Sequence, residues 1–212
     1  MQGVIVSRST LRFIRFFAPA VILIVLGYAT AKVLKLTSVD VPVSVNDLGY
    51  NLGYLIIAAI YQYLPVRDWA YRPFRDDIDE RIRTRLVAIS GLPDDLTKFS
   101  WKRVGNVFYS LIDNDKSLEK RSEDVMFNGA MMTSFADLTA ISAIVLAGNL
   151  IAWACGVEAG RAVLILASIL VVSVIMQWAA KVQHVKLGKY QLDYIEQQLK
   201  QQVIDKMTLL NA

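Results

Sequence analysis

The stretch SFADLTAISAIVLAGNLIAWAC (Ser134–Cys155) leads, through the short connection Gly156–Arg161, into AVLILASILVVSVIMQWAA (Ala162–Ala180). Each stretch has about the 20 residues that a helix needs to cross the apolar core of a bilayer, which is about 30 Å thick. A connection this short joins antiparallel helices. These residues therefore predict a transmembrane helical hairpin.

Two further apolar stretches lie upstream, Phe16–Leu36 and Leu48–Val66. Hydrophobic residues make up 55% of the 212 residues, which is above the ~45–50% typical of soluble domains. The sequence therefore predicts an all-α integral membrane protein with four transmembrane helices arranged as two hairpins. A cleaved signal peptide, with its processing site near Ala29-Thr30-Ala31, is the alternative interpretation of the first stretch.

The segments between the spans predict a small cytosolic insert and a C-terminal helix. In the insert, Ser90-Gly91-Leu92-Pro93 ends a first helix, Pro93-Asp94 opens a second, and a third runs from about Lys116 without a break into the third span. The expected parts are the N-terminal arm with the first hairpin (1–66), the helical insert (67–133), the second hairpin (134–181) and the C-terminal cytosolic helix (182–212).

The C-terminal tail has apolar residues at heptad spacing, namely Val185, Leu192 and Leu199. This spacing predicts either a coiled coil between copies of the chain or an amphipathic helix packed on its own cytosolic domain. Basic residues gather in the tail and in the N-terminal arm, which has Arg8 and Arg12 without an acidic residue. The positive-inside rule therefore predicts that both termini and the insert lie in the cytoplasm.

Signatures of catalysis are missing from the sequence. It contains one histidine, His184, and one cysteine, Cys155, and it has neither a glycine-rich phosphate loop nor a His-Glu-x-x-His zinc helix. A single chain therefore offers too few such residues for a catalytic triad or a histidine-based metal site. We therefore expect no enzyme, no metal site and no cofactor.

Polar residues inside the predicted spans are costly in lipid, so they mark either a water-filled path or hydrogen-bonded seams between helices. Four helices cannot easily enclose a wide conduit, so a pore requires several subunits around a symmetry axis. The candidate pore-lining residues are Asp47, Asn51, Gln62, Asp137, Ser142 and Asn149. The candidate gate is an apolar constriction of Met131, Met132 and Phe135, and ordinary packing is the alternative interpretation of the two methionines.

Basic and aromatic side chains alternate at the start of the second insert helix. Such a surface can hold single-stranded nucleic acid or nucleotides through charge and stacking. Because the insert has as many acidic as basic residues, contact with anionic lipid headgroups and an ordinary solvated surface are the alternatives. The candidate ligand-binding residues are Lys98, Trp101, Lys102 and Arg103.

The four-span layout, the cytosolic insert and the Met131-Met132 pair before the third span together resemble the Hailong-type channel effectors, small membrane proteins encoded beside nucleotide-signalling enzymes in bacterial phage-defence operons. The resemblance implies a homo-oligomeric channel of the bacterial inner membrane, controlled by the nucleic-acid-like product of a partner enzyme. The expected partners are thus other copies of the chain, the lipid bilayer, and a nucleotide-synthesising enzyme or its product. A non-conducting membrane adaptor that anchors a cytosolic enzyme is the alternative function.

Overall fold

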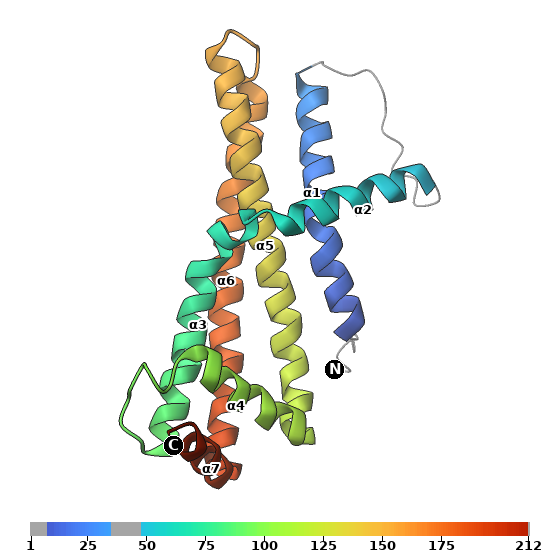
Figure 1. Ribbon diagram of the computed structural model, residues 1–212. Coiled ribbons are helices and arrows are strands. Elements are labelled where there is room, and N and C mark those ends of the chain that lie inside the picture. The colour runs from blue at the N-terminus through green and yellow to red at the C-terminus, as the bar shows by residue number, and fades with distance from the viewer. Residues whose placement is uncertain (1–7, 35–47, 212) are drawn as a thin grey trace. The chain divides into compact units, whose positions relative to one another are not determined.

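The computed structural model describes residues 8–34 and 48–211, which form seven helices and no strand, so the expected all-helical class is confirmed for them. Three helices, α1, α5 and α6, are long and apolar enough to cross a membrane. The helices are α1 (Arg8–Val33), α2 (Leu48–Tyr63), α3 (Val66–Ser90), α4 (Trp101–Asn114), α5 (Lys116–Ala154), α6 (Gly160–Gln198) and α7 (Lys200–Asn211) (Figure 1).

The described residues divide into two compact units. We call them the apolar unit, which holds residues up to Arg72 together with Ala130–Ala180, and the charged unit, which holds Pro73–Gly129 and the residues from Lys181 onward. The charged unit thus combines the predicted insert with the predicted tail. Helices α3, α5 and α6 each contribute residues to both units.

The apolar unit has a small core centred on Leu26, Tyr61, Ile141 and Leu166, from α1, α2, α5 and α6. Much of its remaining apolar surface is exposed, as expected for side chains that face lipid rather than water. The exposed apolar side chains of α6 include Leu164, Ile165, Val171, Val172, Val174 and Ile175.

Exposed tryptophans lie near both ends of the apolar hairpin that α5 and α6 form. Trp153 stands in the last turn of α5, and Trp178 stands on α6 at the other end of the hairpin. Tryptophan is enriched where a membrane meets water, because its ring is apolar and its N–H can bond to water or headgroups. At about 1.5 Å per residue, the helix from Phe135 to Trp153 measures about 27 Å, close to the thickness of a bilayer core.

Helix α2 differs from its sequence-based prediction. The stretch Leu48–Val66 was expected to form a transmembrane helix alongside the first, whereas α2 has 16 residues and runs across α1 (Figure 1). Its helix ends at Tyr63, two residues before Pro65, and the chain then turns into α3. The residue before a proline is disfavoured in the helical conformation, which explains why the helix stops short of Val66.

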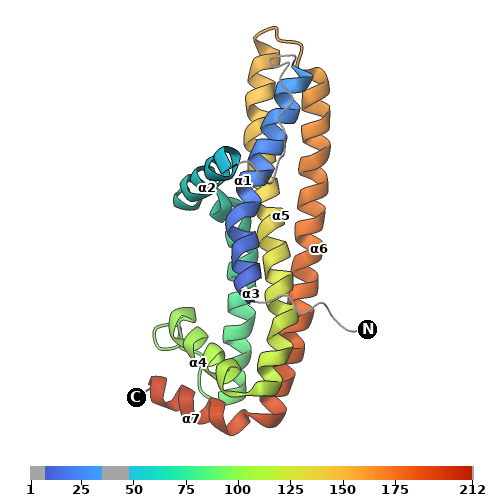
Figure 2. The same cartoon turned by 90° about the vertical axis from the view of Figure 1, so that its right-hand side faces the viewer.

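The charged unit is built around fully buried side chains from each of its helices and from the loop before α4, among them Leu86, Phe99, Leu111, Leu118, Ile195 and Met207. The tail is not the single helix that was predicted over 182–212, because the chain bends at Leu199 and α7 turns away from α6 to contact α4 (Figure 2). Leu199, Val203 and Met207 are buried within the chain. This burial agrees with the amphipathic alternative, in which the tail packs on its own domain.

The other insert helices follow the prediction in part. Helix α5 runs from Lys116 to Ala154 without a break, as expected. The second helix begins at Trp101 instead of at Pro93-Asp94. The delay has a local cause, because the Asp95 carboxylate accepts hydrogen bonds from the Thr97 backbone N–H (2.9 Å) and hydroxyl (2.6 Å). Such an Asx turn competes with helix formation.

Candidate functional site

A fully buried carboxylate, Asp137 of α5, is the centre of the strongest polar cluster in the apolar unit. The guanidinium of Arg67 from α3 donates to both of its oxygens, from Nε to Oδ1 at 2.7 Å and from Nη2 to Oδ2 at 2.9 Å. The Tyr61 hydroxyl from α2 donates to Oδ1 at 3.0 Å. Two parallel N–H···O bonds from one guanidinium make the strongest kind of ion pair in proteins.

Helix α1 joins this cluster through a backbone carbonyl. Pro19 has no N–H, so within α1 it cannot donate to the Arg15 carbonyl four residues earlier. That carbonyl instead accepts from Arg67 Nη2 at 2.8 Å and from Gln62 Nε2 at 3.4 Å. The proline therefore supplies the free acceptor that ties α1 to α2 and α3.

The cluster borders an open recess at the surface of the apolar unit. Its lining consists of Tyr61, Gln62, Leu64, Arg67 and Asp68. The side chain of Arg67 retains 20% of its exposure, whereas that of Asp137 retains none. Arg67 thus lies between the buried carboxylate and the recess.

Asp137 was predicted as a functional residue, whereas sequence reasoning missed Arg67 and Tyr61. A carboxylate in a predicted span requires a cationic or hydrogen-bonding partner. Arg67 is the first basic residue after the second apolar stretch, so the sequence did contain a signal. Nothing in the sequence, however, distinguishes it from the other arginines nearby, because the two partners lie 70 positions apart.

A second set of polar groups forms a seam between helices of the apolar unit. The Thr139 hydroxyl donates to Ser173 Oγ at 2.9 Å and lies 3.4 Å from Gln177 Oε1. Gln177 Nε2 in turn donates to the Ala70 carbonyl at 2.8 Å, so the seam joins α5, α6 and α3. Ser173 and Gln177 are almost fully buried within a single chain. These bonds join the three helices within a single chain.

The other predicted pore-lining residues have varied places. Ser142 and Asn149 are buried, and each donates to a carbonyl of its own helix, at 2.6 Å and 2.8 Å respectively. Gln62 is exposed apart from its bond to Arg15. Asp47 lies outside the described residues, and Asn51 lies in α2 with its side chain outside the described part of the structure.

The predicted gate residues do not share one environment. Met132 is buried at 1% exposure, Met131 is 40% exposed, and Phe135 is half-buried. Neighbouring residues on an α-helix point about 100° apart, so the two methionines cannot both face one constriction from the same helix face. Within a single chain, the Met132 side chain is thus packed inside the apolar unit.

The predicted ligand-binding residues lie in the charged unit, where most of them contact the chain itself. Lys98 Nζ lies 3.1 Å from Asn211 Oδ1, and Arg103 Nη2 donates to the Leu210 carbonyl at 2.8 Å. The ring of Trp101 covers Gly105, where an added Cβ would lie 3.3 Å from the indole. Lys102 is exposed. The basic side chains Lys98 and Arg103 therefore bond to the end of α7.

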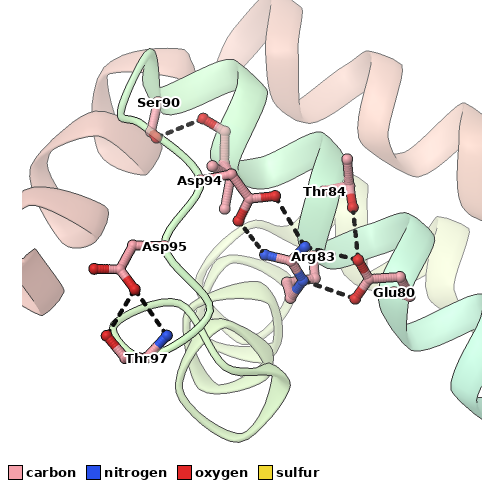
Figure 3. A network of polar contacts seen from close by, with 8 residues as sticks. Glu80, Arg83, Thr84, Ser90, Asp94, Asp95 and Thr97 are labelled. Carbon is pink, nitrogen blue, oxygen red and sulfur yellow. Dashed lines mark hydrogen bonds and ion pairs between the residues drawn. The ribbon is translucent and has the colours of Figure 1, made fainter.

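The charged unit also has a buried arginine, Arg83, which holds the loop after α3 (Figure 3). Its guanidinium pairs with Glu80 at 2.7 Å, one turn back, and with Asp94 at 2.6 Å in the loop. Hydrogen bonds from Arg83 lower the pKa of both carboxyl groups, and the two acids raise the pKa of Arg83. All three groups therefore remain charged at neutral pH, and the network ties the loop to α3.

Asp79 of α3 carries an unfavourable charge. Burial raises its pKa from 3.8 to about 6, with nearby Arg75 opposing the shift and Asp76 adding to it. Because the folded-state pKa is raised, the fold favours the protonated carboxyl, and its contribution to stability is lost as pH rises through about 6. The destabilisation is therefore absent below about pH 4 and complete above about pH 6.

Replacing Asp79 by asparagine is expected to stabilise the protein at pH 7.5 by about 1 kcal/mol, a value discounted for the partial exposure of the carboxyl. The expected rise in melting temperature is about 2–4 °C, and it should become clearly smaller at pH 4.5, where the folded-state carboxyl is protonated. Thermal unfolding in detergent at the two pH values measures this difference. The exposed acid Asp113, replaced in the same way, is the control; an equal gain for Asp113→Asn would contradict the assignment.

Among residues 8–34 and 48–211, no group of three or more histidine, cysteine, aspartate or glutamate side chains is placed to hold a metal ion. Comparison of the sequence with protein-family models, with curated proteins and with solved structures finds no match. The class of protein is therefore defined by the fold and the site alone. Its described residues are all-helical, with three helices long and apolar enough to cross a membrane, and Asp137 of one of them forms a buried ion pair with Arg67 of α3.

Proposed function

We propose that the chain is a non-catalytic, homo-oligomeric ion channel of a bacterial inner membrane, with the apolar unit in the bilayer and the charged unit in the cytoplasm. The buried pair of Asp137 and Arg67 is the observation that carries this proposal. Ionisable groups are rare in lipid-embedded segments, and those that occur mark ion pathways and gating elements. The polar seam of Thr139, Ser173 and Gln177 adds further groups that a conducting state can expose to water.

A cytosolic ligand or partner would control this channel through the charged unit. Helices α3, α5 and α6 run through both units, so a change at the charged unit has a direct covalent route to the apolar one. The resemblance to Hailong-type effectors favours a nucleotide or oligonucleotide made by a partner enzyme in phage defence. Lys98, Lys102 and Arg103 supply the positive charge that such a ligand requires.

In this proposal α1 crosses the bilayer and the chain returns before α3, because Arg67 contacts the Arg15 carbonyl in the first half of α1. The 16-residue α2 runs across α1 in this structure (Figure 1), so it would have to turn alongside α1 to complete the second crossing. Two hairpins with cytoplasmic termini would result.

Labelling of single cysteines in spheroplasts tests this topology. The native Cys155 is exposed and free, so it reports on the α5–α6 connection. In a Cys155→Ser background, Asp40→Cys reports on the predicted first outer loop, whereas Lys102→Cys and Lys200→Cys report on the charged unit. An impermeant maleimide should label the first two positions and spare the last two. Labelling of Lys200→Cys from outside would contradict cytoplasmic termini, and protection of Asp40→Cys would contradict four spans.

Planar-bilayer recording on the purified protein tests conduction directly. We expect discrete currents in the presence of the activating ligand or partner and a low basal leak without it. Liposomes of the same lipids without the protein are the control. Absence of conductance with extracts of infected cells, with oligonucleotides and with nucleotides would refute the channel.

A non-conducting membrane adaptor is the second candidate, and one observation favours it. Asp137, Ser173 and Gln177 all find hydrogen-bond partners within one chain, as expected for helices that only need to pack. An adaptor would hold a soluble enzyme through the charged unit. Recovery of a monomer in detergent that copurifies with a soluble enzyme and carries no current would favour the adaptor, whereas a homo-oligomer that conducts alone would favour the channel.

A further inference from the structure

The Arg67 guanidinium bonds to three oxygen atoms from two other helices, namely both carboxylate oxygens of Asp137 from α5 and the Arg15 carbonyl from α1. The Tyr61 hydroxyl from α2 bonds to the same carboxylate, and the Tyr61 ring centroid lies 6.0 Å from the guanidinium carbon. Nη2 lies 2.9 Å from the carboxylate and 2.8 Å from the carbonyl. Carboxylate and carbonyl oxygens are the donors that hard cations prefer, and they can replace the water around an ion.

We propose that Asp137, the Arg15 carbonyl and Tyr61 form a binding site for a monovalent cation, which the Arg67 guanidinium occupies as a tethered cation in this structure. The inference rests on the proposed function, because it gives the apolar unit a cation-selective step. A single carboxylate balances a single positive charge, which is why the site fits one monovalent ion in place of one arginine.

Pro19 is the residue that makes the carbonyl available. In an unbroken helix the Arg15 carbonyl would accept the N–H of residue 19, and only its second lone pair would remain. With proline at this position, the carbonyl is left with side-chain donors alone, Arg67 and the exposed Gln62. An ion that replaced Arg67 would find this oxygen bonded only to the exposed Gln62 amide, at 3.4 Å.

The recess beside Arg67 offers a route into the site. It is open to the surface and lined by the polar groups of Gln62 and Asp68 as well as by Arg67 itself. Arg67 is the only member of the ion pair with exposed surface. A displaced guanidinium can therefore move into the recess while water and an ion reach Asp137. The hydrogen bond from Tyr61 to the carboxylate need not change.

The test is a chemical rescue of Arg67→Ala in detergent. Thermal unfolding is followed in choline, sodium, potassium and methylguanidinium chlorides at one ionic strength. In choline the variant should melt well below the wild type, since it holds an unpaired buried carboxylate. Raising potassium, sodium or methylguanidinium from about 1 to 300 mM should raise its melting temperature by several degrees with saturation. The wild type and Arg72→Ala, an exposed arginine of the same helix, should show no such cation preference.

Two further variants identify the ligands. Adding Asp137→Asn to Arg67→Ala should abolish the rescue, and adding Pro19→Ala should weaken it because the Arg15 carbonyl returns to the helix. Equal melting of Arg67→Ala in all four salts, or a rescue that survives Asp137→Asn, would overturn the site. If Arg67→Ala aggregates in every salt, Arg67→Gln, which keeps a donor for the carbonyl, is measured in the same way and decides between the same outcomes.

The result does not depend on conduction. A saturable rescue in a protein that carries no current supports the cation site and refutes the channel. A conducting protein whose Arg67→Ala variant is indifferent to the cation keeps the channel and loses the site.

Discussion

Replacing Arg67 by methionine is expected to lower the free energy of unfolding by about 3–5 kcal/mol, the largest effect predicted for a single residue of this chain. Methionine keeps much of the aliphatic length, so the loss comes from the charge. Asp137, at 0% exposure, would remain buried with only the Tyr61 hydroxyl as a partner. The measurement is unfolding in mixed micelles with increasing denaturing detergent.

A double-mutant cycle isolates the pair. Asp137→Leu alone leaves Arg67 partly exposed at 20%, so it should cost less than Arg67→Met. The double variant Arg67→Met/Asp137→Leu has no buried charge, and we expect it to recover most of the loss, because apolar replacements of a buried ion pair are often neutral or stabilising. Losses that simply add in the double variant would show that the two residues do not interact. Arg161→Met, an exposed arginine of the same unit, is the control.

Replacing Arg83 by alanine is expected to destabilise the charged unit by about 2 kcal/mol, the second largest effect. Arg83 is 3% exposed, whereas its partners Glu80 and Asp94 lie in contact with water. The two carboxylates would therefore be rehydrated, and the loss reflects the charge-assisted hydrogen bonds and the packing of the arginine stem. The loop of residues 91–100 loses its tie to α3, so its amides and those at the start of α4 should exchange hydrogen faster.

Two substitutions separate the contributions at this network. Arg83→Lys keeps the charge but cannot bond both acids with one planar group, so it should recover only part of the stability. Arg81→Ala removes an arginine that is exposed on the same helix and paired with Asp77, so little change is expected. Hydrogen exchange measured on all three variants gives the comparison. Protection of residues 91–100 that is unchanged in Arg83→Ala would contradict the proposed tie.

The length and spacing of the apolar stretches were sufficient to predict the long helices, because these depend on local sequence. The apolar stretches Ser134–Cys155 and Ala162–Ala180 lie within α5 and α6, and the unbroken passage from the insert into α5 was also foreseen. Helix formation depends on neighbours within one turn, so a contiguous pattern predicts it well. The start of α4 was misplaced for a local reason too, since the Asx turn at Asp95 prevailed over the helix start expected from Pro93-Asp94.

The partner of Asp137 was beyond the reach of sequence patterns. The sequence marks Asp137 as costly in a span, but Arg67 lies 70 positions away and is one of several arginines near the spans. The partner of the Arg15 carbonyl was equally hidden. The sequence shows that Pro19 cannot donate a backbone hydrogen bond to this carbonyl, but it does not show that Arg67 donates instead. Likewise, the heptad spacing of Leu192 and Leu199 is compatible with a partner chain or with the chain's own α4.

The sequence by itself determined that the chain is helical, that it has long apolar helices, and that a charge lies in one of them, because these properties follow from residue type and local spacing. Only the tertiary structure decided that α2 runs across α1, that the tail turns at Leu199, and that Asp137 meets Arg67, Tyr61 and the Arg15 carbonyl. Those contacts join residues far apart in the chain, and many alternative pairings satisfy the same local pattern. Which pairing forms depends on how the helices pack around a buried charge that must find a partner.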